Sequence, residues 1–460
     1  MRASTILLSV VAVVAGCKPE GGAATEGATG TSWISTSFGE LTTATTEAPT
    51  GSGGMTQGAT SAVMTTDATS GEPTTGAATT GGPVMSRDEV LLRQAIAGEV
   101  DPVEAVRTIG ERGGFPVETA TGSFLFACLC GPGQWTLAGD HNGWTPEPLA
   151  LAGPLYWIEA EIPTPDGSKY KFHEPASMAW IADPHGRRHD YDEYGKISYV
   201  RVSATHLERW YAIDGSSVGL GPRDLEVLVP QNGAFSRVLY AHDGQNLFDP
   251  EAIWGGWKLR ESAPPGVLIV GIANTPARMD EYTPVPDTID GQPVGGAGAA
   301  YAELVETVIR PRVEAAYGPA AVVGTMGSSL GGLISLVIAD LYPDRYDMVI
   351  SLSGTLGWGS LEVDGETILH RYAQAGKRDF AIYIDSGGGG TCFDGDGDGI
   401  EDDGDFNDNF CTNAQMYAIL QSLGYTPGVD VFYVHAPGEP HNEAAWAGRV
   451  EVPLQIFAAL

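Results

Sequence analysis

The residues best suited to chemistry lie in the segment AAVVGTMGSSLGGLISLVIADLYP, residues 320–343. An apolar run leads into GSSLGG and a helical pattern leads out of it, so Ser329 has Gly327 and Gly331 two positions away on either side. A sharp strand-to-helix turn needs small residues at these offsets, because it brings neighbouring backbone segments together. The adjacent Ser328 lacks them. The spacing predicts that Ser329 is a nucleophile, and the alternative is a Gly-Ser helix start without chemistry.

A serine nucleophile needs a base, and two histidines near the C-terminus are candidates. In YVHAPGEPHNEAAW, residues 433–446, His441 follows the last apolar run through a Gly/Pro loop and begins the final helical stretch. A base at this place would overhang a serine at the strand ends. His435 lies inside the run and is the second choice, since a hydrogen-bonded histidine at a sheet end is its more ordinary explanation. The order of the chain therefore predicts His441 as the base.

A run of aspartates between Thr391 and Cys411 has the spacing of a calcium loop. Positions one, three, five, nine and twelve of this loop are Asp394, Asp396, Asp398, Asp402 and Asp405. Gly399 at position six permits a sharp turn, and the Ile400 carbonyl at position seven can supply another oxygen. Oxygen ligands of this kind suit Ca²⁺, and the aspartates would repel one another without a cation. The prediction is a structural Ca²⁺ site with no organic cofactor, and the alternative is a solvated acidic loop.

The elements that must position these residues are continuous apolar runs alternating with helical stretches from residue 223 to residue 460. The runs are LEVLVP, RVLYAHD, GVLIVGIAN, AAVVGTMG, DMVISLSG, FAIYIDS and VFYVHAP. Apolar strands without polar alternation, joined through helices such as YAELVETVIRPRVEAAYG, indicate a mostly parallel sheet covered on both faces. The fold class expected here is α/β.

Residues 86–222 have a different pattern. Residues 86–114 show two short stretches with helical spacing, each opened by a capping residue. Residues 115–222 contain short alternating runs divided by Gly, Pro, Asp and Asn, among them GSFLFACLC, GQWTLAGDHNGW, LYWIEAEI, SKYKFHEP and AWIADP. This pattern predicts a small antiparallel β-sandwich.

The N-terminus indicates export. Residues 1–17, MRASTILLSVVAVVAGC, have an Arg, a short apolar stretch and small residues before Cys17, as in a secretory signal too short to span a membrane permanently. Residues 18–85 are rich in Thr, Gly, Ala and Ser and cannot bury enough apolar surface to form a core, so they are expected to be a disordered tether.

The formal charge of −33 excludes a nucleic-acid partner, because phosphate binding needs clustered cations.

Export permits disulfides, and four cysteines lie beyond Cys17. Cys392 and Cys411 are the natural pair, because their bond closes the acidic loop. Cys128 and Cys130 flank one residue in an expected strand, where side chains alternate between faces, so a bond between them would be strained. The state of these two cysteines stays open at this point.

Three parts of the chain resemble known protein families or motifs. The segments LYAHDGQNLFDPEAIWGGW, GIANTPARMDEYTP, GSSLGG, SLSG and HNEAAW together resemble the enterochelin esterase and esterase D group of α/β-hydrolases from about Asp224 to the C-terminus. LAGDHNGW, YKF and WIADP resemble the immunoglobulin-like early-set domains that precede the catalytic domain in enterochelin esterases and glycogen-active enzymes. VAGC resembles a bacterial lipobox, which implies that Cys17 is lipidated.

The esterase resemblance implies an acyl-enzyme mechanism with Ser329 as nucleophile and His441 as base. It places the oxyanion hole at the backbone N–H of Leu330 and of Gly244 or Gln245 in the HDGQN loop. The carboxylate that orients the base is expected a few residues after the strand FAIYIDS and before a helix. Here the acidic insert separates the two, so Asp408, counted back from the helix, is the chosen acid. Asp385, at the end of the strand, is the runner-up.

Substrate contacts are expected on the loops around this centre. Arg278 and Glu281 follow a strand end, where such enzymes bind acyl or alcohol groups, and the alternative for them is an ion pair within the loop. Three tryptophans are candidates to line the cleft, and the alternative for them is packing in the core. They are Trp254, Trp257 and Trp358.

The sequence therefore predicts an exported esterase, anchored by lipid to a bacterial membrane and facing the periplasm or the cell exterior. Its substrate would be a small-molecule or polysaccharide-linked ester of a kind the sequence does not name. One alternative is a surface glycan-binding protein with a degenerate hydrolase domain, because some early-set relatives bind glycans. Another is an acyltransferase that uses the same triad.

Overall fold

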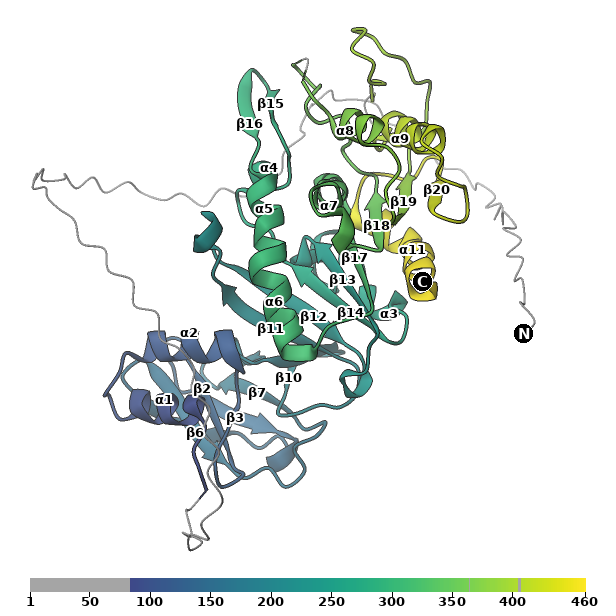
Figure 1. Cartoon of the computed structure of the whole chain (residues 1–460). Helices are drawn as coiled ribbons and strands as arrows, with labels where there is room; N and C mark the ends of the chain where they lie inside the picture. Colours follow the sequence, from purple (N-terminus) through teal and green to yellow (C-terminus); the bar gives the residue numbers. More distant parts are fainter. Residues whose placement is uncertain (1–82, 364, 404–406) are drawn as a thin grey trace, which may run out of the picture. The chain divides into compact units, whose positions relative to one another are not determined.

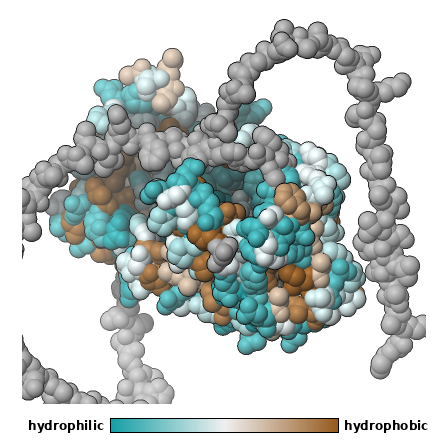
Figure 2. Space-filling view, turned by 90° about the horizontal axis from the view of Figure 1, so that it is seen from above, coloured by the Kyte–Doolittle hydropathy of each residue, from teal (hydrophilic) through white to brown (hydrophobic). Residues whose placement is uncertain are grey.

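The structure is a computed structural model that describes residues 83–363, 365–403 and 407–460 (Figure 1). The expected signal segment, Cys17, almost all of the tether and Asp405 lie outside the described residues. Among the helices of the described part, none combines the length and apolar character that a membrane crossing requires. Where Figure 2 shows described residues, hydrophilic and hydrophobic patches are mixed, which is the ordinary composition of a protein surface.

Two helices open the described chain, α1 (Arg87–Ile96) and α2 (Pro102–Arg112). Each begins at a capping side chain, since Ser86 accepts a hydrogen bond from the N–H of Glu89 and Asp101 accepts from Val103 and Glu104. Their apolar sides pack on one face of a four-stranded antiparallel sheet with strand order β1-β2-β6-β5.

Short antiparallel strands make up the region from residue 117 to residue 199. Their bounds are β1 Val117–Glu118, β2 Phe124–Cys128, β3 Thr136–Gly139, β4 Glu147–Pro148, β5 Ala150–Ala152, β6 Leu155–Ala160, β7 Lys169–Glu174, β8 Ala179–Ile181, β9 Arg188–Asp192 and β10 Gly195–Tyr199. Alternate β2 residues face opposite ways, with Leu125 packed toward the helices and Phe126 packed toward Tyr170 of β7. Two antiparallel layers thus enclose a small core.

The larger sheet contains the seven apolar runs of residues 223–460 as strands, together with one strand that precedes them, β11. They are β11 His206–Ile213, β12 Arg223–Val229, β13 Arg237–His242, β14 Val267–Ile272, β17 Val322–Ser328, β18 Met348–Leu352, β19 Ala381–Ser386 and β20 Val431–His435, in the order β20-β19-β18-β17-β13-β14-β12-β11. From β20 to β14 every neighbouring pair is parallel, whereas β12 and β11 are antiparallel additions. The sheet is therefore mixed and mostly parallel, as its unbroken apolar runs indicate.

One boundary differs from the sequence-based expectation. The sequence-based boundary at residue 222 would leave β11 in the first β-region, the expected sandwich of residues 115–222. In the structure, β11 pairs with β12 from His206↔Val229 to Ile213↔Arg223. It also pairs with β9 at Leu207 and Glu208, which joins the strands of both regions into one continuous sheet. The alternating polar residues of β11 make it look like a sandwich strand, because it lies toward the antiparallel side of the larger sheet.

Helices cover both faces of the larger sheet (Figure 1). Their bounds are α3 Leu259–Ser262, α4 Arg278–Glu281, α5 Gly298–Leu304, α6 Arg310–Tyr317, α7 Leu330–Leu341, α8 Ile368–Ala375, α9 Phe410–Ser422, α10 Glu443–Arg449 and α11 Glu451–Ala459. One π turn, Val305–Ile309, joins α5 to α6, and a separate hairpin of β15 (Pro286–Ile289) and β16 (Gln292–Gly295) lies between α4 and α5.

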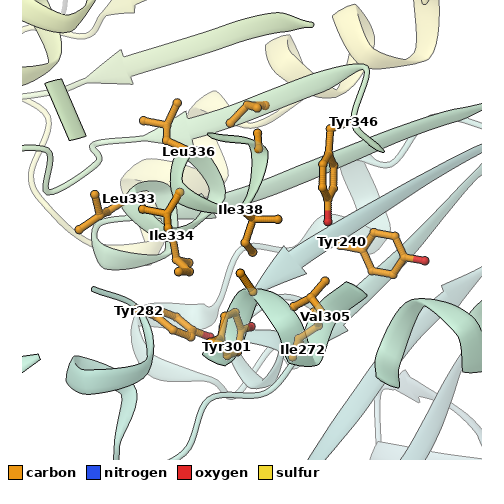
Figure 3. Close-up of a cluster of buried hydrophobic side chains, with 14 of the residues drawn as sticks. Tyr240, Ile272, Tyr282, Tyr301, Val305, Leu333, Ile334, Leu336, Ile338 and Tyr346 are labelled. Atoms are coloured by element: carbon orange, nitrogen blue, oxygen red, sulfur yellow. The ribbon is translucent and has the colours of Figure 1, made fainter. Parts of the chain in front are cut away.

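Helix α7 lies at the centre of the larger core. Figure 3 shows Leu333, Ile334 and Ile338 of α7 within the cluster that also contains Tyr282 and Tyr301. Leu333, Ile334 and Ile338 are fully buried. Burying each such side chain contributes about 1.5–3 kcal/mol, so the helix that leaves Ser329 is firmly fixed.

Candidate active site

Ser329 occupies a strained turn between β17 and α7. Its backbone has φ 55° and ψ −125°, a conformation that side-chain-bearing residues rarely adopt. A Cβ atom on Gly327 would lie 2.4 Å from the backbone carbon of Gly331, so glycine is required there by direct contact. The spacing of the sequence motif thus has the physical cause that was expected for it.

The Ser329 hydroxyl lies in a short polar chain. Its Oγ is 3.3 Å from Oγ1 of Thr355, which in turn lies 3.3 Å from Nδ2 of Asn409. Asn409 also donates to the carbonyl of Ser353 at 2.8 Å. In the part of the chain that the structure describes, the hydroxyl contacts Thr355 and makes no hydrogen bond to His441.

His441 lies on the loop between β20 and α10. Its Nδ1 is 2.6 Å from Oδ1 of Asp408, and its side chain is 31% exposed. The ring packs edge-on against Trp446 of α10 at 5.0 Å. The second-choice histidine, His435, stacks on Phe410 at 4.3 Å and has no carboxylate partner among the described residues.

Asp408 is buried and surrounded by donors. Its Oδ2 accepts hydrogen bonds from the Ser353 hydroxyl at 2.6 Å and from the backbone N–H of Gly387. Burial raises the pKa of Asp408, but the hydrogen bonds from His441, Ser353 and Gly387 outweigh burial and hold the pKa below its usual value. Asp408 is therefore a carboxylate beside the Nδ1 of His441.

The runner-up acid, Asp385, has different partners. It is fully buried, accepts from Arg449 at 3.2 and 3.3 Å, and accepts from the Tyr383 hydroxyl at 3.2 Å. Burial raises the pKa of Asp385 to about 6, although Arg449 opposes the rise. The structure brings Asp408, and not Asp385, to His441.

The loop after β13 faces the Ser329 turn. Gly244 packs against β14 so closely that a Cβ atom would lie 2.5 Å from the backbone carbon of Gly271. The Gln245 side chain accepts from the N–H of Asn274 at 3.1 Å. Leu330 begins α7, where helix N–H groups are free of intrahelical partners.

Arg278 and Glu281 each have a partner that the sequence did not indicate. Arg278 makes a two-pronged ion pair with Asp243, at 2.7 and 2.8 Å, instead of pairing with Glu281. Glu281 is 2% exposed and pairs with the buried Arg223 at 3.0 Å. The expected substrate contact is wrong for Glu281, because this residue is buried in the core, and the alternative of an Arg278–Glu281 ion pair is not formed either.

Asp243 lies beside the nucleophile turn, because a Cβ on Gly331 would be 3.2 Å from its Oδ2. Burial raises the pKa of Asp243, but Arg278 and Asn274 outweigh burial and lower it overall. Sequence reasoning missed this residue, although the HDGQN motif contains it. Its position directly after a strand was the available signal.

The three tryptophans divide between core and surface. Trp257 and Trp358 are each 2% exposed and belong to the two core clusters, so packing explains them. Trp254 is 61% exposed on the segment that precedes Trp257.

The acidic loop gathers part of its expected ligand set. Carboxylate oxygens of Asp394, Asp396 and Asp398 lie within 4.8 Å of one another. Asp402 accepts from the N–H of Gly395 at 2.7 Å. The Ile400 side chain is 6% exposed and packs into the larger core, which ties the middle of the loop to the domain.

The four cysteines of the described residues form two disulfide bonds in the structure. Cys392 is joined to Cys411 at the start of α9, and Cys128 is joined to Cys130. The first bond is the expected one, and the second answers the question that strand alternation left open, because Cys130 lies beyond the end of β2.

Comparison with known proteins decides the family. A family model described as "Putative esterase" matches residues 221–451, half of the chain. The chain belongs to this esterase family. The family is one of esterases, and the matched residues contain most of the mixed sheet, which has helices on both faces.

Individual relatives of this esterase are distant. It is 29% identical over 130 residues to the uncharacterized protein YbbA of Bacillus subtilis, a match that covers 27% of this chain and 51% of that protein, so the chain spans about half the length of this curated relative. An IroE-like serine hydrolase from Shewanella oneidensis is 18% identical, with 55% of this chain and 80% of that chain covered and a TM-score of 0.41. The enterobactin esterase of Shigella flexneri is 15% identical, with coverages of 73% and 93% and a TM-score of 0.42.

Proposed function

We propose that this esterase uses Ser329, His441 and Asp408 as a catalytic triad and acts as an exported lipoprotein. The observation that carries the proposal is the 2.6 Å contact between the His441 ring and a buried carboxylate, on the same edge of the sheet as a serine in a strained strand-to-helix turn. This combination is what nucleophilic acyl transfer requires.

In the proposed reaction, the Ser329 hydroxyl turns from Thr355 to Nε2 of His441 and gives up its proton as Oγ attacks the ester carbonyl. Asp408 keeps the Nδ1 proton of His441 in place and offsets the charge of the imidazolium. The imidazolium then protonates the leaving alcohol, and the acyl group stays on Ser329. Water repeats the sequence, releasing the carboxylic acid and restoring the hydroxyl.

The developing oxyanion would be held by backbone N–H groups of Leu330 and of Gly244 or Gln245. Gly244 supports this assignment, since its loop is pressed against β14 and is thereby fixed in place. Losing one such donor typically costs about 3–4 kcal/mol of transition-state stabilisation.

The substrate proposed here is a small-molecule or polysaccharide-linked ester, with Arg278 and Trp254 as the contact residues that remain open to it. Asp243 already neutralises Arg278, and the chain carries a net charge of −33. An uncharged ester therefore fits this surface better than a strongly anionic one.

The decisive measurement is turnover of p-nitrophenyl acetate by the full chain and by Ser329→Ala. The variant is expected to lose at least about a thousandfold in kcat. Turnover retained by Ser329→Ala would refute the nucleophile assignment. A panel of esters differing in charge and size would then rank substrate classes.

We also propose a structural Ca²⁺ in the acidic loop, held by Asp394, Asp396 and Asp398 with the Ile400 carbonyl, Asp402 and Asp405. The three clustered carboxylates support it, since such oxygens crowd together only at a cost unless a cation is bound. The ion would supply cross-linking of the loop and no step of the reaction. EGTA is expected to lower Tm, with Ca²⁺ restoring it and Mg²⁺ not. An unchanged Tm would contradict the site.

For the N-terminal regions, we propose a lipid anchor at Cys17, a tether, and an immunoglobulin-like early-set domain that contacts glycan. A pocket of about 820 Å³ supports glycan contact, because Trp144 and the 43%-exposed Trp180 line it with their rings 6.3 Å apart. Aromatic rings beside charged side chains are suited to sugar faces and hydroxyls. Loss of membrane attachment in Cys17→Ala, and of polysaccharide retention in Trp180→Ala, would test the two parts separately.

A further inference from the structure

Ser353, just beyond the end of β18, lies at the junction of the two buried aspartates. It is fully buried, with φ 48°. Its hydroxyl oxygen is 3.0 Å from Nε1 of Trp446, 2.9 Å from a terminal nitrogen of Arg449 and 2.6 Å from Oδ2 of Asp408. None of these contacts belongs to the reaction sequence proposed above.

The direction of the hydrogen bonds follows from the chemistry of the partners. An indole N–H and a guanidinium are donors only, so the Ser353 oxygen accepts from both Trp446 and Arg449. These two bonds use both lone pairs of the hydroxyl oxygen. The hydroxyl hydrogen is then left for the remaining neighbour, Oδ2 of Asp408, which is an acceptor.

Arg449 links the same point to Asp385. Its side chain is 8% exposed, and its guanidinium donates to both oxygens of Asp385 and lies 3.5 Å from Oδ2 of Asp408. The N–H of Ser353 also donates to Asp385, at 3.2 Å. Asp385 thus balances a buried cation that would otherwise act on Asp408 alone.

We propose that Ser353 is a positioning residue for the general base: oriented by Trp446 and Arg449, its hydroxyl fixes Asp408 so that Oδ1 faces Nδ1 of His441, and Asp385 sets the charge at this point. The inference rests on the proposed triad. Trp446 and Arg449 are one helical turn apart on α10, and His441 lies just before that helix, so one element carries the base and the donors that orient its acid.

The proposal predicts a change in the pH dependence of kcat/KM. The acid limb of that profile reports protonation of the general base, His441, in the free enzyme. The groups around His441 and Asp408 are Arg449 and Glu443 on α10, Asp385 on β19, and Asp243 and Arg278 on the loops after β13 and β14. Removing the Ser353 hydroxyl takes away a dipole whose positive end faces Asp408, so imidazolium is favoured and the acid limb moves to higher pH. Removing the charge of Asp385 moves the limb to lower pH.

The experiment compares Ser353→Ala, Asp385→Asn and the control Ser351→Ala in the full chain with p-nitrophenyl acetate. Ser351 is a fully buried serine on β18, two residues before Ser353, and its hydroxyl has no hydrogen-bond partner among the described residues. We expect Ser353→Ala to lower kcat about 10- to 100-fold at unchanged KM and to raise the acid limb by about 0.5 pH unit or more. Asp385→Asn should shift the limb in the opposite direction, and Ser351→Ala should shift neither quantity.

Should Ser353→Ala fold poorly, Ser353→Gly removes the same hydroxyl and suits the positive φ. If either Ser353 variant has the kcat and the pH profile of Ser351→Ala, the inference is overturned. It is also overturned if the acid limb of kcat/KM moves in the same direction in the Ser353 and Asp385 variants. Full activity of Ser329→Ala would overturn the triad itself, which separates failure of the proposed function from failure of this inference.

Discussion

Replacing Asp408 and Asp385 separately with Asn tests the acid assignment most sharply. In Asp408→Asn, the Ser353 hydroxyl and the Gly387 N–H both still donate toward the former Oδ2 position. The amide oxygen must take that place, because an NH₂ group there would face two donors. The NH₂ group then faces Nδ1 of His441 and stabilises the tautomer with its proton on Nε2, which cannot accept the proton of Ser329.

The expected loss follows from this tautomer. Holding a catalytic imidazole in the wrong tautomer costs about 10⁴-fold in kcat, or about 5.4 kcal/mol. In Asp385→Asn, the donors that lose a charged acceptor are Arg449, Tyr383 and the Ser353 N–H, and none of them touches His441. This variant should lose about 3–5 kcal/mol of stability through the unpaired Arg449, but less than about tenfold in kcat.

The assay is turnover of p-nitrophenyl acetate at the pH plateau, paired with urea unfolding of both variants. Asp408→Asn should keep near-native stability and lose activity, whereas Asp385→Asn should show the reverse. If Asp385→Asn lost more turnover than Asp408→Asn in folded protein, the hydrogen-bond argument for Asp408 would be refuted.

Three further predictions concern the turn, the loop beside it and the first β-region. In Gly327→Ala, the added Cβ would lie 2.4 Å from the backbone of Gly331, so the free energy of unfolding should fall by about 1–3 kcal/mol and kcat by about 100-fold or more. The control is Gly221→Ala, where a Cβ meets nothing within 4 Å. Arg278→Ala leaves the buried Asp243 unpaired and should cost about 3–5 kcal/mol in urea unfolding, which a merely exposed arginine would not. Burial raises the pKa of Asp183 to about 7, so Asp183 is protonated in the folded state below that pH. Its contribution to the free energy of unfolding is complete below about pH 3.9, the pKa in the unfolded chain, and should fall by about 4 kcal/mol as the pH rises to 7. Asp183→Asn should remove this pH dependence of stability.

The sheet was predictable because its central strands are apolar without interruption. The runs beginning at Leu225, Val238 and Phe380 each lie in or beside a strand of the larger sheet, and the glycines around Ser329 reported a close backbone contact that exists. The boundary at residue 222 left β11 with the sandwich region, and the polar alternation of β11 does not reveal the difference, because it fits a sandwich strand as well as an antiparallel strand of a mixed sheet.

The contacts that hold the site together could not be predicted in the same way. Ser353 meets Asp408 across 55 residues of chain and Arg449 across 96, and Arg278 meets Asp243 across 35. No local spacing encodes such pairs, because they depend on how the strands are ordered in the sheet. Counting back from α9 did reach Asp408, since that aspartate lies within two residues of the helix and moves with it.

The acidic insert leaves and re-enters the domain at almost the same point. A Cβ atom on Gly388 would lie 1.9 Å from the carbonyl oxygen of Asn407, so the two ends of the excursion are in direct backbone contact. Asp408 follows Asn407 immediately and is held by Gly387 and Ser353, while the Ile400 side chain and the Cys392–Cys411 bond attach the insert to the domain at further points. A change in the length of the insert therefore need not separate Gly387 from Asp408, because these two residues lie beside the same backbone contact.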